Sequence, residues 1–169
     1  MSQNTSHLVS SPPPFDAIRF RNLMGRFATG VAVLTFAQND TTGATTINAF
    51  MSVSLEPALV LVSVRTGGRF HTHVHKDALF GISFLNARQQ DISHRFASKE
   101  PTEAAAQTFS HLNTIPIISD ALVQMAVRVQ DIHPAGDHQL YVCEVMALNE
   151  DAGDATSPLL FFAGKYATL

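Results

Sequence analysis

Apolar and polar positions along the chain predict more strands than helices. Two helices are predicted by apolar residues at intervals of three and four, one from Phe15 to Thr29 that packs one face inward and one around residues 88–97. Apolar runs bounded by turn residues predict strands at residues 31–37, 44–54, 59–64, 79–85, 121–130, 139–148 and 159–163. No regular helical crossovers separate the strands, and G-x-G-x-x-G is absent, which argues against a doubly wound parallel sheet. The pattern favours a mainly β fold, an antiparallel β-barrel with flanking helices.

Composition places the chain in one globular domain. It has 169 residues, of which 46% are hydrophobic and 15% are charged. Residues 1–14 are polar and end in a proline run, which predicts a flexible N-terminal tail followed by a domain at residues 15–169. There is no export signal, and no apolar run approaches the ~20 residues that span a bilayer. We therefore expect a cytoplasmic protein that makes no membrane contact.

Net charge and cysteine content argue against two further classes of protein, those that bind nucleic acid and those held by disulfides. The formal net charge of -3 gives no electrostatic reason to expect nucleic acid as a partner. Cys143 is the only cysteine, so an intrachain disulfide is excluded. Because Cys143 falls in the middle of a predicted strand, we expect a buried, unreactive thiol.

Histidines at alternate positions in residues 70–75, FHTHVH, raise the question of a metal site. A strand would place all three on one face, whereas a helix would pair only His71 with His75. The preceding Gly67-Gly68-Arg69 favours a loop that enters a short helix. No third ligand follows from the sequence, so we expect solvated histidines and no metal.

Two other stretches could form a ligand site. Residues 45–54 are rich in hydroxyl and amide side chains, which suit a polar pocket, although composition alone favours a strand that faces water. Gly136-Asp137-His138 predicts a turn that holds a histidine at the mouth of the next strand. A lone turn histidine is usually only solvated, so both alternatives stay open here.

In chain order, several segments together resemble one family, the flavin reductase-like, FMN-binding split-barrel proteins that act as reductase components of two-component flavin monooxygenases. The segments are residues 20–31, FRNLMGRFATGV; 48–57, around SVSLEP; 90–97, QDISHRFA; 136–145, beginning GDH; and 158–166, PLLFF followed by GKY. The resemblance runs from Phe15 to Leu169. It implies an antiparallel, Greek-key-like split β-barrel.

By this resemblance, the chain is an NAD(P)H:flavin oxidoreductase that reduces FMN or FAD with NADH or NADPH and supplies a separate monooxygenase. The resemblance also implies a homodimer with the flavin pocket between subunits. Its implied flavin contacts are Thr46, Asn48, Ser52 and Ser54, and it places His138 near the nicotinamide or the reactive flavin face.

The loop at residues 67–70 departs from the family, because it lacks the hydroxyls that usually meet the flavin phosphate. Arg69 is expected to substitute for them through a charge-assisted contact. His71 matches a common family position, whereas His73 and His75 have no assigned role. The altered loop leaves two alternatives, a flavin carrier or sensor without turnover and a structural dimer without cofactor.

Overall fold

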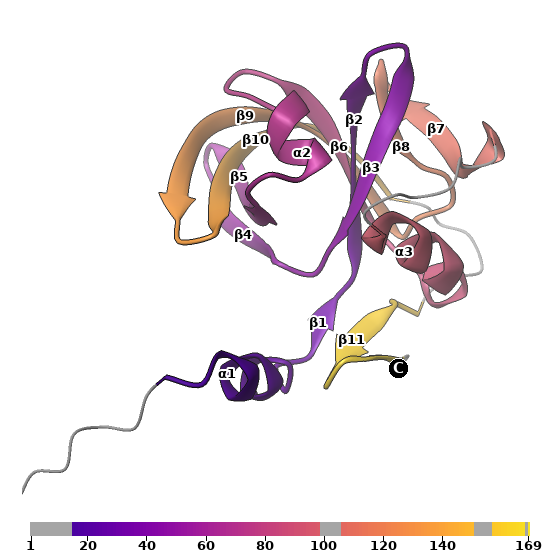
Figure 1. Cartoon of the computed structure of the whole chain (residues 1–169). Helices are drawn as coiled ribbons and strands as arrows, with labels where there is room; N and C mark the ends of the chain where they lie inside the picture. Colours follow the sequence, from indigo (N-terminus) through magenta and orange to yellow (C-terminus); the bar gives the residue numbers. More distant parts are fainter. Residues whose placement is uncertain (1–14, 99–105, 151–156, 168) are drawn as a thin grey trace, which may run out of the picture.

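The computed structural model describes residues 15–98, 106–150, 157–167 and 169 (Figure 1). The predicted tail at residues 1–14 lies outside them. The helices are α1 (Ala17–Met24), α2 (Arg69–His73) and α3 (Gln90–Ala97), with short 3-10 turns η1 (Ala87–Gln89) and η2 (Ala106–Thr108). Within these ranges, no helix has the length and apolar character needed to cross a bilayer.

A seven-stranded antiparallel sheet forms the body, in the order β3-β2-β6-β9-β10-β5-β4. The edge strands β3 and β4 do not pair with each other, so the curved sheet is not closed by hydrogen bonds. The prediction of a mainly β, antiparallel fold is confirmed. The strands of the seven-stranded sheet are β2 (Ala32–Gln38), β3 (Thr41–Ile47), β4 (Phe50–Leu55), β5 (Ala58–Arg65), β6 (Leu79–Phe84), β9 (Val123–Ala135) and β10 (His138–Glu150).

Two smaller sheets complete the fold. β1 (Thr29–Gly30), β11 (Leu160–Phe162) and β12 (Lys165–Ala167) form one of them beside α1. β7 (Phe109–Leu112) and β8 (Ile115–Ile118) form the other, a hairpin that the hydrophobic pattern did not predict. β7 and β8 have only four residues each, too few for alternation to separate a strand from a loop.

The main core fills the concave side of the sheet and is covered by α2. Phe70 of α2 is fully buried and makes edge-on ring contacts with Phe36, Phe80 and Tyr141. Burying large aromatic rings at this point stabilises α2 against the sheet, because a five-residue helix is too short to be stable alone. The core therefore fixes the loop that leads into α2.

A second core cluster joins the sheet to α3 and to the C-terminal strands. Its buried side chains include Val33, Leu85, Phe96 and Leu159. The side chain of Asn86 begins η1 by accepting a hydrogen bond from the Arg88 amide. The predicted helix around residues 88–97 is thus confirmed, with a 3-10 turn at its start.

The first helix is shorter than predicted and its apolar face is not buried in the chain. Asp16 caps α1 by accepting from the amides of Ile18 and Arg19, and Gly25 ends the helix. α1 has no buried residue, and the apolar side chains predicted to face inward are all at least 48% exposed: Phe20, Leu23, Met24 and Phe27. The prediction of inward packing is wrong because the helix lies apart from the seven-stranded sheet (Figure 1).

The predicted strand at residues 44–54 is two strands. The chain leaves β3 after Ile47 and re-enters extended structure at Phe50. The Ser63 amide donates to the Ala49 oxygen across 3.1 Å and holds the break beside β5. Because a long-range contact fixes this corner, local alternation did not reveal it. The corner places Asn48 at the junction of two hollows.

Candidate functional site

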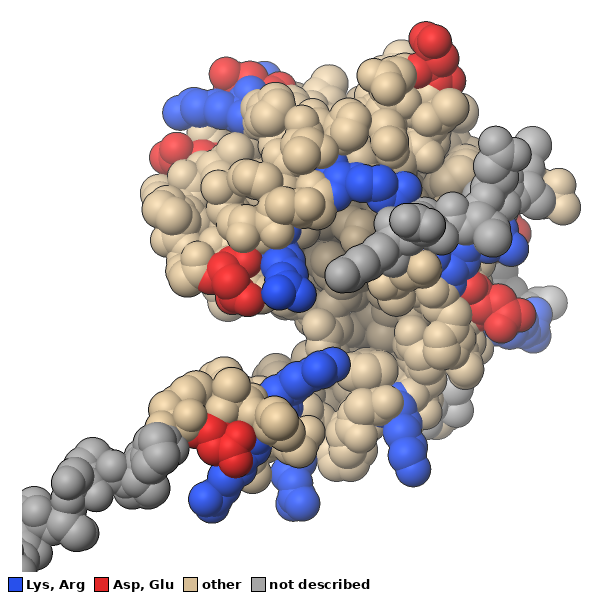
Figure 2. Space-filling model, viewed as in Figure 1, with Lys and Arg blue, Asp and Glu red and all other residues tan. Residues whose placement is uncertain are grey.

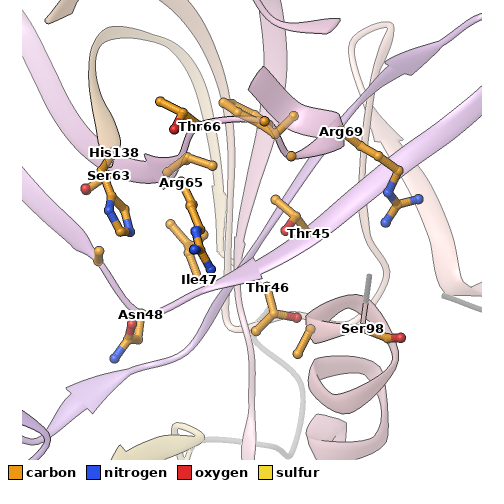
Figure 3. A pocket seen from close by; sticks show the side chains of 16 residues that line it. Thr45, Thr46, Ile47, Asn48, Ser63, Arg65, Thr66, Arg69, Ser98 and His138 are labelled. Carbon is orange, nitrogen blue, oxygen red and sulfur yellow. The ribbon is translucent and has the colours of Figure 1, made fainter. Parts of the chain in front are cut away.

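A hollow of about 760 Å³ lies between the end of β3, the end of β5 and the N-terminal part of α2 (Figure 3). We call it the loop hollow. Hydroxyls, an amide and two guanidinium groups line it together with backbone, at residues 45–49, 63–70, 97, 98 and 138. This volume falls within the range of ~300–1,000 Å³ typical of small-molecule sites.

A second hollow of about 1270 Å³ separates α1 from the sheet, and we call it the helix cleft. Figure 2 shows it as an open cleft with Lys or Arg side chains on both sides. It is lined by residues 16, 18–27, 29, 48, 137, 138, 161, 163 and 164. Asn48 and His138 line both hollows, so the two spaces adjoin at these residues.

Thr46 is held in the wall of the loop hollow by α3. Its Oγ1 donates to the Ser93 backbone oxygen across 2.8 Å, and Ser93 Oγ lies 2.7 Å from the Tyr166 hydroxyl. The proton of the Thr46 hydroxyl is therefore committed to the protein. The same oxygen keeps lone pairs with which it can accept a hydrogen bond from a ligand.

The loop at residues 65–69 brings positive charge to the rim of the loop hollow. Gly67 has a φ of +77°, and the amides at the start of α2 have no side-chain cap. Arg69 Nη2 donates to the Ala44 oxygen across 3.0 Å. In Figure 3 the Arg69 guanidinium points away from His138, whereas Arg65 extends between His138 and Thr45. Arg65 is thus a basic residue of this hollow that sequence reasoning missed.

His138 is the first residue of β10 and pairs directly with Arg65 of β5. The preceding turn places Gly136 at a φ of +64°, which agrees with the predicted turn. His138 Nδ1 lies 2.7 Å from Asp137 Oδ1. This hydrogen bond, more than the nearby Arg65, lowers the pKa of Asp137. Asp137 is therefore an ionised acceptor beside the histidine at neutral pH.

The structure brings together four of the residues expected at a flavin site and leaves two apart. Thr46, Asn48, Arg69 and His138 all line the loop hollow. Ser52 and Ser54 lie on β4 and are not among the residues that line either hollow. A bulge in the pairing with β5 falls between these two serines.

The histidine stretch forms a short helix, as expected, but His75 lies beyond its end. His71 Nδ1 is 3.3 Å from the buried Tyr141 hydroxyl, and His73 Nδ1 is 2.8 Å from the Arg69 oxygen. Across the described ranges, no three His, Cys, Asp or Glu side chains are placed to hold a metal ion. The two helical histidines instead secure α2 behind the loop.

Cys143 is fully buried in β10, as predicted. Burial raises the pKa of its thiol to about 12, so the thiolate is rare at neutral pH. Nucleophilic chemistry at this residue is therefore not part of the site.

Comparisons with known proteins show the family to which the chain belongs. The sequence profile of the family described as "Flavin reductase like domain" matches residues 24–169. An NADH-dependent flavin reductase from Rhodococcus sp. is 38% identical, over 93% of this chain and 89% of that protein. The reductase subunit of a flavin-dependent monooxygenase from Mycobacterium tuberculosis is 33% identical, over 89% of this chain and 81% of that protein.

A solved structure shows the same fold. The styrene monooxygenase flavin reductase from Pseudomonas putida S12 is 30% identical and superimposes with a TM-score of 0.83. The match covers 89% of this chain and 97% of that one. The similarity therefore extends over most of both chains rather than a single motif.

Proposed function

The chain belongs to the flavin reductase like domain family, and we propose that it is an NAD(P)H-dependent flavin reductase that supplies reduced flavin to a separate monooxygenase. The names of its relatives, an NADH-dependent flavin reductase and a monooxygenase reductase subunit, support this activity. They do not favour the alternative of a flavin carrier or sensor. NADH is the expected co-substrate, with NADPH as the second possibility, and FMN or FAD is the flavin.

One observation carries the proposal: the two hollows adjoin at Asn48 and His138, which line both of them. Reduction of one bound molecule by another requires both to be held in contact in a fixed orientation. A single pocket would suit a carrier, whereas two spaces with a shared wall suit a flavin and a nicotinamide nucleotide. We place the flavin in the loop hollow and the nucleotide in the helix cleft.

The loop hollow fits a flavin by its donors as well as its size. A flavin phosphate needs positive charge and N–H donors, and Arg65, Arg69 and the uncapped start of α2 offer both. The ring needs hydrogen-bond partners at its polar edge, which Thr46 and Asn48 can supply. Ser52 and Ser54 lie outside this hollow, so we leave them out of the proposed contacts.

When bound, the flavin would supply the acceptor for a hydride from the nicotinamide, so the electron chemistry belongs to the cofactors. The protein binds and orients both molecules. The two arginines counter the phosphate charge, and Asn48 borders the meeting point of the two spaces. His138 is proposed to position the nicotinamide or to stabilise negative charge that develops on the reduced ring, without acting as an obligatory base.

Assembly is the second part of the proposal. The apolar side chains of α1 are exposed in the single chain, and Leu55 at the end of β4 is 96% exposed. Exposed apolar groups in such number are typical of a surface covered by another protein. We propose a homodimer that covers them and a transient contact with an oxygenase. The cytoplasm is the proposed compartment, because the nicotinamide nucleotides are available there.

The test is oxidation of NADH and NADPH by the purified protein with FMN and with FAD in turn. Protein-dependent nucleotide oxidation that requires added flavin would support the proposal and identify the preferred pair. The variant His138→Ala should slow this oxidation more than it weakens flavin binding. Flavin binding with no oxidation of either nucleotide would identify a carrier or sensor instead.

A further inference from the structure

Three polar side chains meet where the β9–β10 turn faces the end of β5. His138 and Arg65 are register partners on adjacent strands, and Asp137 precedes His138. Asp137 Oδ1 lies 2.7 Å from His138 Nδ1, and Asp137 Oδ2 lies 4.0 Å from Arg65 Nε. The carboxylate therefore stands between the guanidinium and the imidazole.

The backbone holds this carboxylate in place. The Thr66 amide donates to the backbone carbonyl oxygen of Asp137 across 3.0 Å, and Thr66 Oγ1 donates to the same backbone oxygen across 3.1 Å. These two bonds fasten the turn to the end of β5. Asp137 is thus anchored through its main chain, although its side chain is 74% exposed.

The two contacts of the carboxylate differ in strength. An exposed ion pair at 4.0 Å contributes little, because solvent screens it. A hydrogen bond of 2.7 Å between a carboxylate and an imidazole is short and charge-assisted. The contact that orients His138 is therefore the one with Asp137, and Arg65 mainly adds positive charge nearby.

An ionised carboxylate can only accept hydrogen bonds, so Nδ1 of His138 must carry the proton. This leaves Nε2 as the ring nitrogen available to a ligand, and Nε2 has no partner within the described ranges. In Figure 3 the ring projects into the loop hollow above Asn48. The direction of the ring and the identity of its free nitrogen are both consequences of Asp137.

We propose that Asp137 is a positioning residue, which fixes His138 as the Nδ1–H tautomer and turns Nε2 toward the polar group of a ligand held between the two hollows. The inference rests on the proposed function for its kinetic consequence only. In this proposal Asp137 makes no contact with a reacting atom. It acts through the histidine, as a carboxylate does when it orients a working imidazole.

The kinetic test is a double-mutant cycle that follows reduction of the bound flavin by nucleotide. Asp137→Ala should slow reduction about tenfold, as expected for a lost hydrogen bond to a charged group, and should change the flavin dissociation constant less than about twofold. Asp137→Glu, which keeps the carboxylate, should restore part of the rate. In protein that already carries His138→Ala, Asp137→Ala should have little further effect.

Asp131→Ala is the matched control, because Asp131 is an exposed carboxylate on the same hairpin that pairs with Lys76 at 3.7 Å. It should leave the rate unchanged. If Asp137→Ala slows the His138→Ala protein as much as the native protein, or slows the native protein no more than Asp131→Ala does, the proposed role is wrong.

A spectroscopic test separates this inference from the reductase activity. Long-range proton–nitrogen correlation spectra of ¹⁵N-labelled protein distinguish the two imidazole tautomers without any turnover. His138 should show the Nδ1–H form in the native protein and a mixture of tautomers in Asp137→Ala. A native spectrum with the proton on Nε2 would overturn the inference even if the enzyme is active, and an inactive protein with the Nδ1–H form would overturn the function alone.

Discussion

Arg69 Nη2 donates a hydrogen bond to the backbone oxygen of Ala44 across 3.0 Å, and this bond ties the start of α2 to β3. The remaining N–H groups of the guanidinium stay available to an anion. The same side chain can therefore hold the loop at residues 65–69 in place and contribute positive charge to an anion bound there.

Removal of Arg69 should weaken flavin binding. Arg69→Ala is expected to raise the flavin dissociation constant about tenfold, because a charge-assisted contact with phosphate is lost. Arg65→Ala should weaken binding in the same direction. Arg88→Ala, which removes an exposed arginine outside both hollows, is the control. Fluorescence titration measures each constant, and an unchanged constant for Arg69→Ala would contradict the phosphate assignment.

Gly81 should not tolerate a side chain. A Cβ at this position of β6 would collide with the Pro116 backbone oxygen and the Thr35 hydroxyl. Gly81→Ala is therefore expected to lower the free energy of unfolding by about 2 kcal/mol. Urea denaturation measures the change. Gly30→Ala, where a Cβ meets nothing within 4 Å, should stay within about 0.5 kcal/mol of the native protein. Equal losses of stability in the two variants would contradict the close approach of β8 to β6.

The buried thiol should make the fold sensitive to alkali. Burial raises the pKa of Cys143 from 9.0 to about 12, so between these values the folded state keeps a proton that the unfolded state has lost. Stability from this group is complete below pH 9 and falls as pH rises toward 12. From pH 8 to pH 10, the native protein should lose about 1.4 kcal/mol more than Cys143→Ala. If the free energies of unfolding of the two proteins change in parallel with pH, the burial of the Cys143 thiol is contradicted.

The exposed apolar face of α1 should support a dimer. Phe20 and Leu23 are 50% and 48% exposed in the single chain. Light scattering after gel filtration is expected to give twice the mass of one chain, and Phe20→Glu combined with Leu23→Glu should shift the protein toward monomer. Leu79→Glu, at a leucine that is 47% exposed on β6, is the control. A native protein that runs as a monomer at all concentrations would contradict this assembly.

Local pattern predicted β5 and β10, two of the strands that carry the site, because their apolar runs are bounded by strong turn signals. Gly136 and Asp137 mark the start of β10, and Gly67-Gly68 marks the end of β5. The helical period around Phe20 predicted α1 correctly as a helix. The helical period of the apolar residues shows that one face of α1 is apolar, but it does not show what covers that face. Inward packing against the sheet could therefore not be predicted from the period.

The composition of the site was only partly predictable for the same physical reason. Arg65 ends an apolar strand and has no motif around it, and its place beside His138 depends on the pairing of β5 with β10. Asp137 was visible as a turn residue, but its hydrogen bond with His138 is a matter of side-chain geometry. Ser52 and Ser54 share their sequence stretch with Thr46 and Asn48, yet the corner after Ile47 separates them from the hollow.

The measurement that tests the central claim most directly is anaerobic rapid mixing of the protein and FMN with NADH, and then with NADPH, while the visible absorbance of the flavin is followed. The two adjoining hollows predict rapid bleaching that requires the protein and is fastest with one of the two nucleotides. Flavin that binds but remains oxidised with both nucleotides would contradict the reductase and leave a flavin carrier or sensor on the same fold.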